Sequence, residues 1–122
     1  MTTQEVANRL VELCRAGKYQ QVHEELYSSD IVSVEPEGAP NRIAKGMEAI
    51  AAKGMKFESM LEKVYSSTVS DPIVAENFFC CNMLMNIQLK GAPGPVDMDE
   101  LCVFNVKDGK IIKEEFFYTP RP

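Results

Sequence analysis

Residues 96–118 decide the fold of this chain and read VDMDELCVFNVKDGKIIKEEFFY. Asp108-Gly109 separates two long runs of strand-forming residues, and this dipeptide is a strong signal for a tight hairpin because glycine tolerates positive φ. The first run contains LCVFNV at residues 101–106, which places apolar side chains on both faces of a strand. A strand of this kind needs a cover on each face. We therefore predict a hairpin whose first strand is central in a sheet.

Composition restricts the class of protein. With 122 residues, the chain is expected to form a single domain over residues 1–122. A net charge of −5 without any basic run argues against a nucleic-acid partner or an anionic membrane surface. No apolar run reaches the roughly 18 residues that a membrane span needs, and the first residues lack the pattern of a signal peptide. We therefore expect a cytoplasmic protein.

The cysteines give no sign of a metal or redox site. Cys80 and Cys81 are adjacent, and Cys14 and Cys102 are isolated, so no metal-ligand or CxxC spacing is present. Reduced thiols in a hydrophobic core are the simplest interpretation. The sequence also lacks a glycine-rich phosphate loop. We expect neither a metal nor a cofactor.

Hydrophobic periodicity divides the rest of the chain into helices followed by strands. Thr2 and Glu5 have the spacing of a capping box that begins the first helix, and Gly17 is placed to end it. The further predicted elements, in chain order, are a helix over residues 18–28, a strand over 31–35, a helix over 46–60, and strands over 62–70 and 73–89.

This order indicates an α+β fold with the helices on one face of an antiparallel sheet. The three helices can cover only that face, and no helix is predicted after residue 70. The second face would then expose apolar residues such as Phe78, Leu84 and Leu101. Patches of this kind usually mark an interface, and two-fold dimers are its commonest form. We predict a homodimer with Phe104 or its neighbours near the two-fold axis.

Four short segments carry a resemblance to a known family: RAG at residues 15–17, LYSSD at 26–30, KGMEAI at 45–50 and DGKI at 108–111. In their order and spacing, the chain resembles the nuclear-transport-factor-2-like superfamily, in particular its SnoaL-like and ketosteroid-isomerase-like members. The resemblance implies a cone-shaped curved antiparallel sheet, three N-terminal helices on its concave face and an internal pocket. It also implies pairing of two sheets through the convex face. This superfamily includes both enzymes and non-catalytic proteins, so the fold alone does not give the function.

The resemblance implies a general base at Glu35, because ketosteroid isomerases have a carboxylate followed by proline at the end of this strand. A carboxylate at the edge of an apolar pocket holds a proton more tightly, which suits a base near neutral pH. The alternative is a strand-end glutamate in solvent. The two other isomerase groups do not carry over: the helix tyrosine matches Leu10, and the strand aspartate falls near Leu101, with Asp99 two residues earlier on the same face.

Two further acid–base candidates follow. Glu114 alternates with Phe116 and Tyr118 on the face that lines the pocket in the resembled fold, although on an edge strand it would be exposed. His23 is the only histidine, at the rim of the second helix. The catalytic candidates are therefore Glu35, Glu114 and His23. The predicted ligand-binding residues combine the apolar faces of the helices and strands: Leu10, Cys14, Tyr19, Ile50, Phe57, Phe79, Met83, Asp99, Leu101, Phe116 and Tyr118.

Two classes of function stay open from the sequence. One is an isomerase, cyclase or dehydratase that transfers protons on an apolar carbonyl-bearing or cyclic metabolite, with Glu35 as base. The other is a non-catalytic protein that binds a small apolar molecule or serves as a dimeric scaffold. The polar groups of the pocket separate the two classes, because two or more titratable groups at a common point favour an enzyme.

Overall fold

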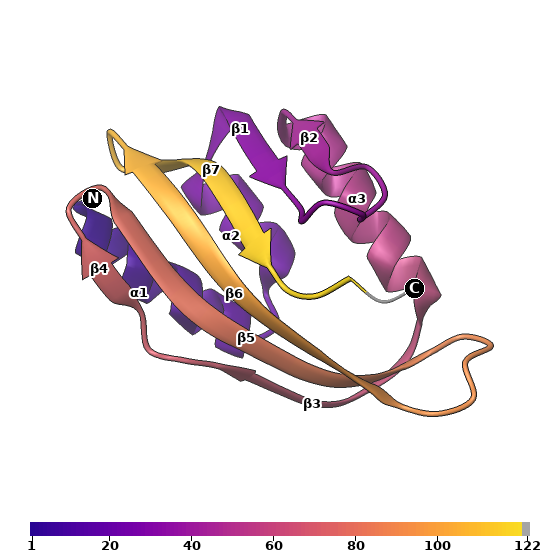
Figure 1. Ribbon diagram of the computed structural model, residues 1–122. Helices are drawn as coiled ribbons and strands as arrows, with labels where there is room; N and C mark the ends of the chain where they lie inside the picture. Colours follow the sequence, from indigo (N-terminus) through magenta and orange to yellow (C-terminus); the bar gives the residue numbers. More distant parts are fainter. Residues whose placement is uncertain (121–122) are drawn as a thin grey trace.

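The computed structural model describes residues 1–120, and these form three helices and a seven-stranded sheet (Figure 1). The elements in chain order are α1 Thr3–Arg15, α2 Tyr19–Leu26, β1 Tyr27–Val34, β2 Ile43–Lys45, α3 Met47–Met60, β3 Leu61–Val69, β4 Ile73–Ala75, β5 Phe78–Leu89, β6 Val96–Lys107 and β7 Lys110–Phe117. No helix within this part of the chain has the length and apolar character needed to cross a membrane.

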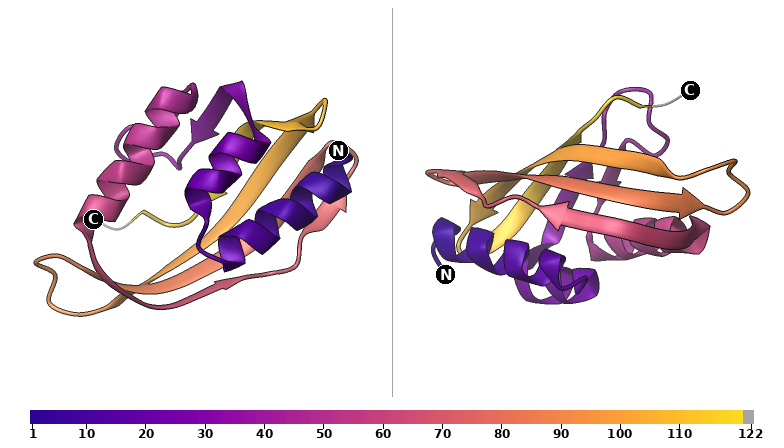
Figure 2. Two further views of the ribbon diagram at one scale, coloured as in Figure 1. Left: turned by 180° about the vertical axis from the view of Figure 1, so that it is seen from behind. Right: turned by 90° about the horizontal axis from the view of Figure 1, so that it is seen from below.

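The sheet is strongly curved, and all three helices lie on the same side of it (Figure 2). Its strand order is β2-β1-β7-β6-β5-β3, and β4 pairs with the beginning of β5. The predicted α+β fold, with helices on the concave face, is confirmed. The sheet is antiparallel except that β1 runs parallel to β7. β7 is therefore flanked on both sides, and residues in its middle cannot be edge residues.

Local sequence signals explain the first helices. The Thr2 hydroxyl accepts a hydrogen bond from the Glu5 amide at 3.1 Å, and the Glu5 carboxylate accepts one from the Thr2 amide at 2.8 Å, so the predicted capping box is present. Gly17 has φ +72, a value that favours glycine, and the chain turns there into α2. α2 is shorter than the predicted 18–28, because the backbone becomes extended at Tyr27 and β1 begins four residues before the predicted strand.

The prediction of one strand over residues 73–89 is wrong. Residues 73–75 form β4, which folds back on β5 with Ala75 opposite Phe78. Glu76 has φ +53, and the Asn77 carbonyl accepts a hydrogen bond from the Val106 amide at 2.8 Å, which ties the turn to β6. The polar pair Glu76-Asn77 between the two apolar runs marks this tight turn in the sequence.

The final hairpin forms as predicted. Asp108 and Gly109 both have positive φ, 51 and 75, as the turn that matches the twist of two paired strands requires. A side chain at position 109 would also meet the backbone of Met1 at 3.1 Å. The turn residue therefore allows the close approach between the start of the chain and the hairpin.

The core lies between α1, α2 and the concave face of the sheet. Phe79 and Phe104 are directly opposite each other on β5 and β6, each 1% exposed, with their rings stacked at 4.7 Å. Of the positions expected near a two-fold axis, Phe104 or its neighbours, Phe104 itself is unsuitable because its ring points into the core. Its neighbours in the sequence point to the convex face, which no helix covers (Figure 2). The large exposed apolar side chains on that face include Ile73, Phe78, Leu101 and Phe117.

Candidate active site

Glu35 follows β1 directly and turns its side chain to the concave side, where only 14% of it is exposed. Its amide donates a hydrogen bond to the Arg42 carbonyl at 2.7 Å, which fixes the backbone at the strand end. One carboxylate oxygen, Oε1, lies 3.1 Å from the ammonium of Lys53 on α3. The other, Oε2, is buried and is the only such side-chain atom without a hydrogen-bond partner within residues 1–120. The alternative of a glutamate in open solvent does not hold.

Glu114 is 5% exposed in the middle of β7, which settles its two alternatives in favour of the interior. The Tyr27 hydroxyl donates a hydrogen bond to Glu114 Oε1. Ser33 is its register partner on β1. Burial raises the pKa of Glu114, and the hydrogen bonds from Tyr27 and Ser33 oppose this effect. Burial and the neighbouring carboxylate also raise the pKa of Tyr27 well above its ordinary value.

Glu100 is the third carboxylate, and the sequence analysis missed it. It lies on β6 opposite Met83 and alternates with the buried residues Cys102 and Phe104, so it faces the concave side. Burial raises its pKa to about 7, and the charges of Glu35 and Glu114 add to this effect while Lys53 opposes it. Counting back in steps of two from Cys102 would have found this residue.

Asp99 and Leu101 lie on the opposite face, contrary to the expectation that they bind a ligand in the pocket. Leu101 is 45% exposed, and the exposed Asp99 accepts a hydrogen bond from the Asn82 amide group at 2.7 Å. Glu100, which lies between these two residues on β6, is the one that faces the concave side. A shift of one residue moves every side chain of a strand to the other face.

Tyr118 and Phe116 lie beside the carboxylates. Burial raises the pKa of Tyr118 to about 12, and the charges of Glu35 and Glu100 and the approach of its hydroxyl to the Glu35 carboxylate contribute. The Lys53 ammonium lies 5.0 Å from the centre of the Phe116 ring. Both aromatic residues are half-buried. Side chains that share this intermediate exposure, on the same face of β5 and β6, are Met83, Met85 and Met98.

The other predicted residues have different surroundings. Leu10, Cys14, Ile50 and Phe79 are buried in the core cluster, against which Met83 and Phe116 pack. Phe57 is half-buried on α3. Tyr19 is 40% exposed at the start of α2. The His23 ring lies against the Tyr27 ring, tilted by 36° with ring centres 4.7 Å apart, and burial lowers the pKa of His23.

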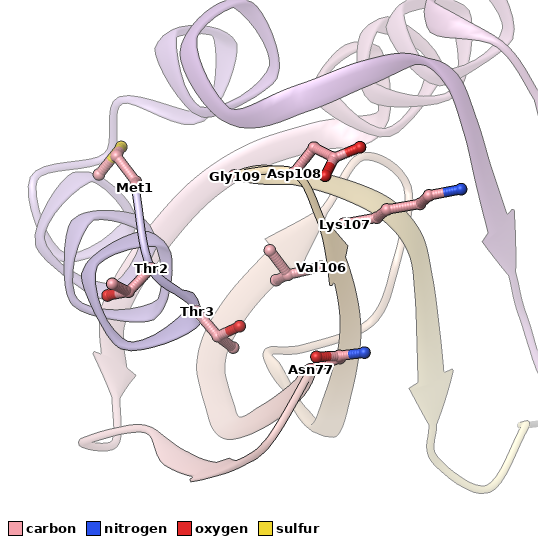
Figure 3. Close-up of a pocket in the computed structure, with 8 residues that line it drawn as sticks. All are labelled: Met1, Thr2, Thr3, Asn77, Val106, Lys107, Asp108 and Gly109. Atoms are coloured by element: carbon pink, nitrogen blue, oxygen red, sulfur yellow. The ribbon is translucent and has the colours of Figure 1, made fainter.

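Two surface hollows lie away from the carboxylates. One, of about 350 Å³, lies between the first residues and the β6–β7 turn, and Figure 3 shows its lining: Met1, Thr2, Thr3, Asn77, Val106, Lys107, Asp108 and Gly109. The second, of about 490 Å³, surrounds the start of α2 and includes Tyr19 as the only predicted site residue within it. Neither contains an acid–base candidate from the sequence. Across residues 1–120, no three His, Cys, Asp or Glu side chains are grouped so that they could hold a metal ion.

The arrangement defines a small curved-sheet protein with carboxyl groups on its concave face. The chain belongs to the SnoaL-like domain family, whose model matches residues 1–118. The resemblance inferred from the sequence is thereby confirmed. No protein of curated function matches the sequence.

Solved structures share the fold. One is a Mesorhizobium loti protein that is named both as a SnoaL-like polyketide cyclase and as a carbohydrate phosphatase. It is 30% identical over 97% of this chain and 100% of its own, with a TM-score of 0.91. A Jannaschia sp. CCS1 protein, also named as a SnoaL-like polyketide cyclase, is 16% identical over 95% and 85% of the two chains, with a TM-score of 0.76. TerC, co-crystallised with polyporic acid, is 15% identical over 96% and 91%, with a TM-score of 0.75. The last two similarities concern the fold alone.

Proposed function

We propose that the concave face is an active site for acid–base proton transfer on a small apolar molecule that carries a carbonyl group or a ring, as in an isomerase, cyclase or dehydratase. The observation that carries this proposal is the convergence of Glu35, Glu100 and Glu114 from different parts of the sheet, beside one ammonium. Environments that hold neighbouring carboxyl groups at different proton affinities supply an acid and a base at one pH.

The roles follow from the surroundings of each group. Among residues 1–120, Glu35 Oε2 has no hydrogen-bond partner, so this oxygen can accept a proton from a carbon next to a carbonyl group. The electron pair of that C–H bond moves to the carbonyl oxygen, where negative charge develops. Glu100, with its pKa raised to about 7, keeps its proton on a large share of molecules at neutral pH and can donate a hydrogen bond to this oxygen. Glu35 then returns its proton to another carbon.

Non-catalytic binding is the alternative. A pocket lined by methionine and phenylalanine with a single acid would favour binding, and the half-buried Met83, Met85 and Phe116 are consistent with a wall that adapts to an apolar ligand. Three carboxyl groups at one point favour the enzyme instead. An experiment that measures both binding and proton transfer on the same protein distinguishes the two functions.

The test uses nitrobenzisoxazole, a planar apolar compound that a base converts to a coloured phenolate by removing one C–H proton as the N–O bond breaks. The protein is expected to accelerate this reaction above the buffer rate, and Glu35→Gln to reduce the acceleration by about a hundredfold or more. Glu37→Gln is the matched control, since Glu37 is exposed in the following loop.

Binding of a fluorescent naphthol, measured by titration, provides the second reading. Naphthol binding without any acceleration of benzisoxazole opening would support the non-catalytic alternative. An acceleration that is the same in the protein and in Glu35→Gln would contradict the role of Glu35.

We also propose that a second copy of the chain covers the convex face. Leu101 and Phe117 are register partners on β6 and β7, and both are almost half exposed, at 45% and 48%. Asn82 lies beside Leu101 on β5, and an amide can hydrogen-bond across such a contact without burying a charge. The patch is apolar at its centre and polar at its edge, as dimer interfaces are.

Light scattering at micromolar concentration is expected to give a mass of twice 13.7 kDa. Leu101→Lys would place two ammonium groups in the contact and is expected to give the monomer mass. Met55→Lys is the control, because Met55 is 70% exposed on α3, away from the convex face. A monomer mass for the unaltered protein would show that this face is not paired.

A further inference from the structure

Lys53 is the one cation placed against Glu35 within residues 1–120, and it was not a candidate from the sequence. We propose that Lys53 is a positioning residue: it holds Glu35 Oε1, so that Oε2 alone accepts the proton. This inference rests on the proposed function, which it deepens by giving a cause for the choice of Glu35 as base.

Three contacts fix the ammonium group. Its Nζ donates to the Ser33 hydroxyl at 2.9 Å, lies 3.1 Å from Glu35 Oε1, and stands 5.0 Å from the centre of the Phe116 ring. These partners come from β1, from the residue after β1 and from β7. A flexible lysine side chain held from three directions has lost its usual freedom. The position of Glu35 Oε1 is then fixed with it.

The two oxygens of Glu35 therefore differ. Oε1 is engaged by the ammonium, whereas Oε2 is buried without a partner within residues 1–120. A buried acceptor without a hydrogen bond has lost its contacts with water and gained none in return, which destabilises the folded protein. A fold that retains this cost next to a fixed ammonium leaves one defined acceptor for a ligand. The geometry of the pair thus directs the proton to Oε2.

Charge supports the same assignment. The titratable groups that interact with the pair are Glu100 on β6, Glu114 on β7 and Tyr118 after β7. The Tyr27 hydroxyl on β1 contacts Glu114 in turn. Lys53 lowers the pKa of both Glu100 and Glu114 against the effect of burial. With the cation removed, three carboxyl groups would share the site without an opposite charge, and each would hold its proton more tightly.

The experiment measures the pH profile of benzisoxazole opening by Lys53→Met in the full chain. Loss of the ammonium should move the acidic limb, which reports Glu35, to higher pH by about one unit, and so reduce the rate on that limb about tenfold. Lys53→Arg keeps the charge and should restore part of the shift. Lys56→Met is the control, because Lys56 is exposed one turn further along α3. A lower rate with unmoved limbs would show a merely structural role and overturn the proposal, as would an unchanged profile.

A second measurement keeps the proposal testable without turnover. NMR titration of the Glu35 carboxyl carbon, assigned with Glu35→Gln, should show a higher midpoint in Lys53→Met than in the unaltered protein. Ser33→Ala removes only the second anchor of the ammonium and should give a smaller shift in the same direction. A midpoint that does not move would overturn the proposal. If the midpoint moves but the protein does not accelerate benzisoxazole opening, the interaction between Lys53 and Glu35 is supported and the proposed function is rejected.

Discussion

Replacing Phe104 by alanine is expected to lower the free energy of unfolding by about 3–5 kcal/mol. Phe104 is 1% exposed, stacks on Phe79 at 4.7 Å and lies opposite Glu114 on the next strand. Its removal takes a large apolar surface out of the core and leaves a cavity that the curved sheet cannot close. The second contribution explains why the loss exceeds the transfer free energy of the ring.

Urea and thermal unfolding at one fixed protein concentration measure this loss, since association would otherwise change the apparent stability. The melting temperature should fall by about 10–20 °C. Phe104→Leu retains much of the volume and should lose far less. Met55→Ala, at a position 70% exposed, should stay within about 0.5 kcal/mol of the unaltered protein. A loss below about 1 kcal/mol for Phe104→Ala would contradict the position of this ring in the core.

The second large effect is a pH dependence of stability caused by Glu100. Burial raises its pKa to about 7 from an ordinary value of 4.5. Between these two pH values the folded protein keeps a proton that the unfolded chain has released. The free energy of unfolding that this group contributes is therefore complete below about pH 4.5 and is lost as the pH rises through about 7. Allowing for partial solvent screening, the loss amounts to about 1–3 kcal/mol.

Urea unfolding of the unaltered protein and of Glu100→Gln at about pH 5 and about pH 8 isolates this contribution. The variant cannot ionise, so it should gain about 1–3 kcal/mol relative to the unaltered protein between the two pH values. The comparison cancels carboxylates that do not interact with Glu100, including Glu5 and Glu25, whose pKa values hydrogen bonds lower. Glu62→Gln, at an exposed position on β3, should show no relative change. Parallel pH dependences for Glu100→Gln and the unaltered protein would refute the burial of this carboxyl group.

Sequence motifs of only a few residues were enough to predict several features of the fold. The capping box of Thr2 and Glu5 and the turn at Asp108-Gly109 depend on contacts between near neighbours, and both form as predicted. Alternation along β5 correctly separated the face of Phe79 from the face of Phe78, because a strand repeats every two residues. The family resemblance led to Glu35, whose side chain lies on the concave side.

The sequence by itself thus determined the class of fold, the final hairpin and most of the core, because these depend on periodicity and turn chemistry. Only the tertiary structure decided which groups surround Glu35. Lys53 is one of two lysines on α3, and its distance of 3.1 Å from Glu35 depends on how that helix docks on β1. Glu114 is buried because β1 returns parallel to β7, a pairing between distant segments. Predicting that Glu100 faces the concave side required the register of β6 to be known to one residue. Docking angles and long-range register arise from the packing of the whole chain, and a local pattern does not encode them.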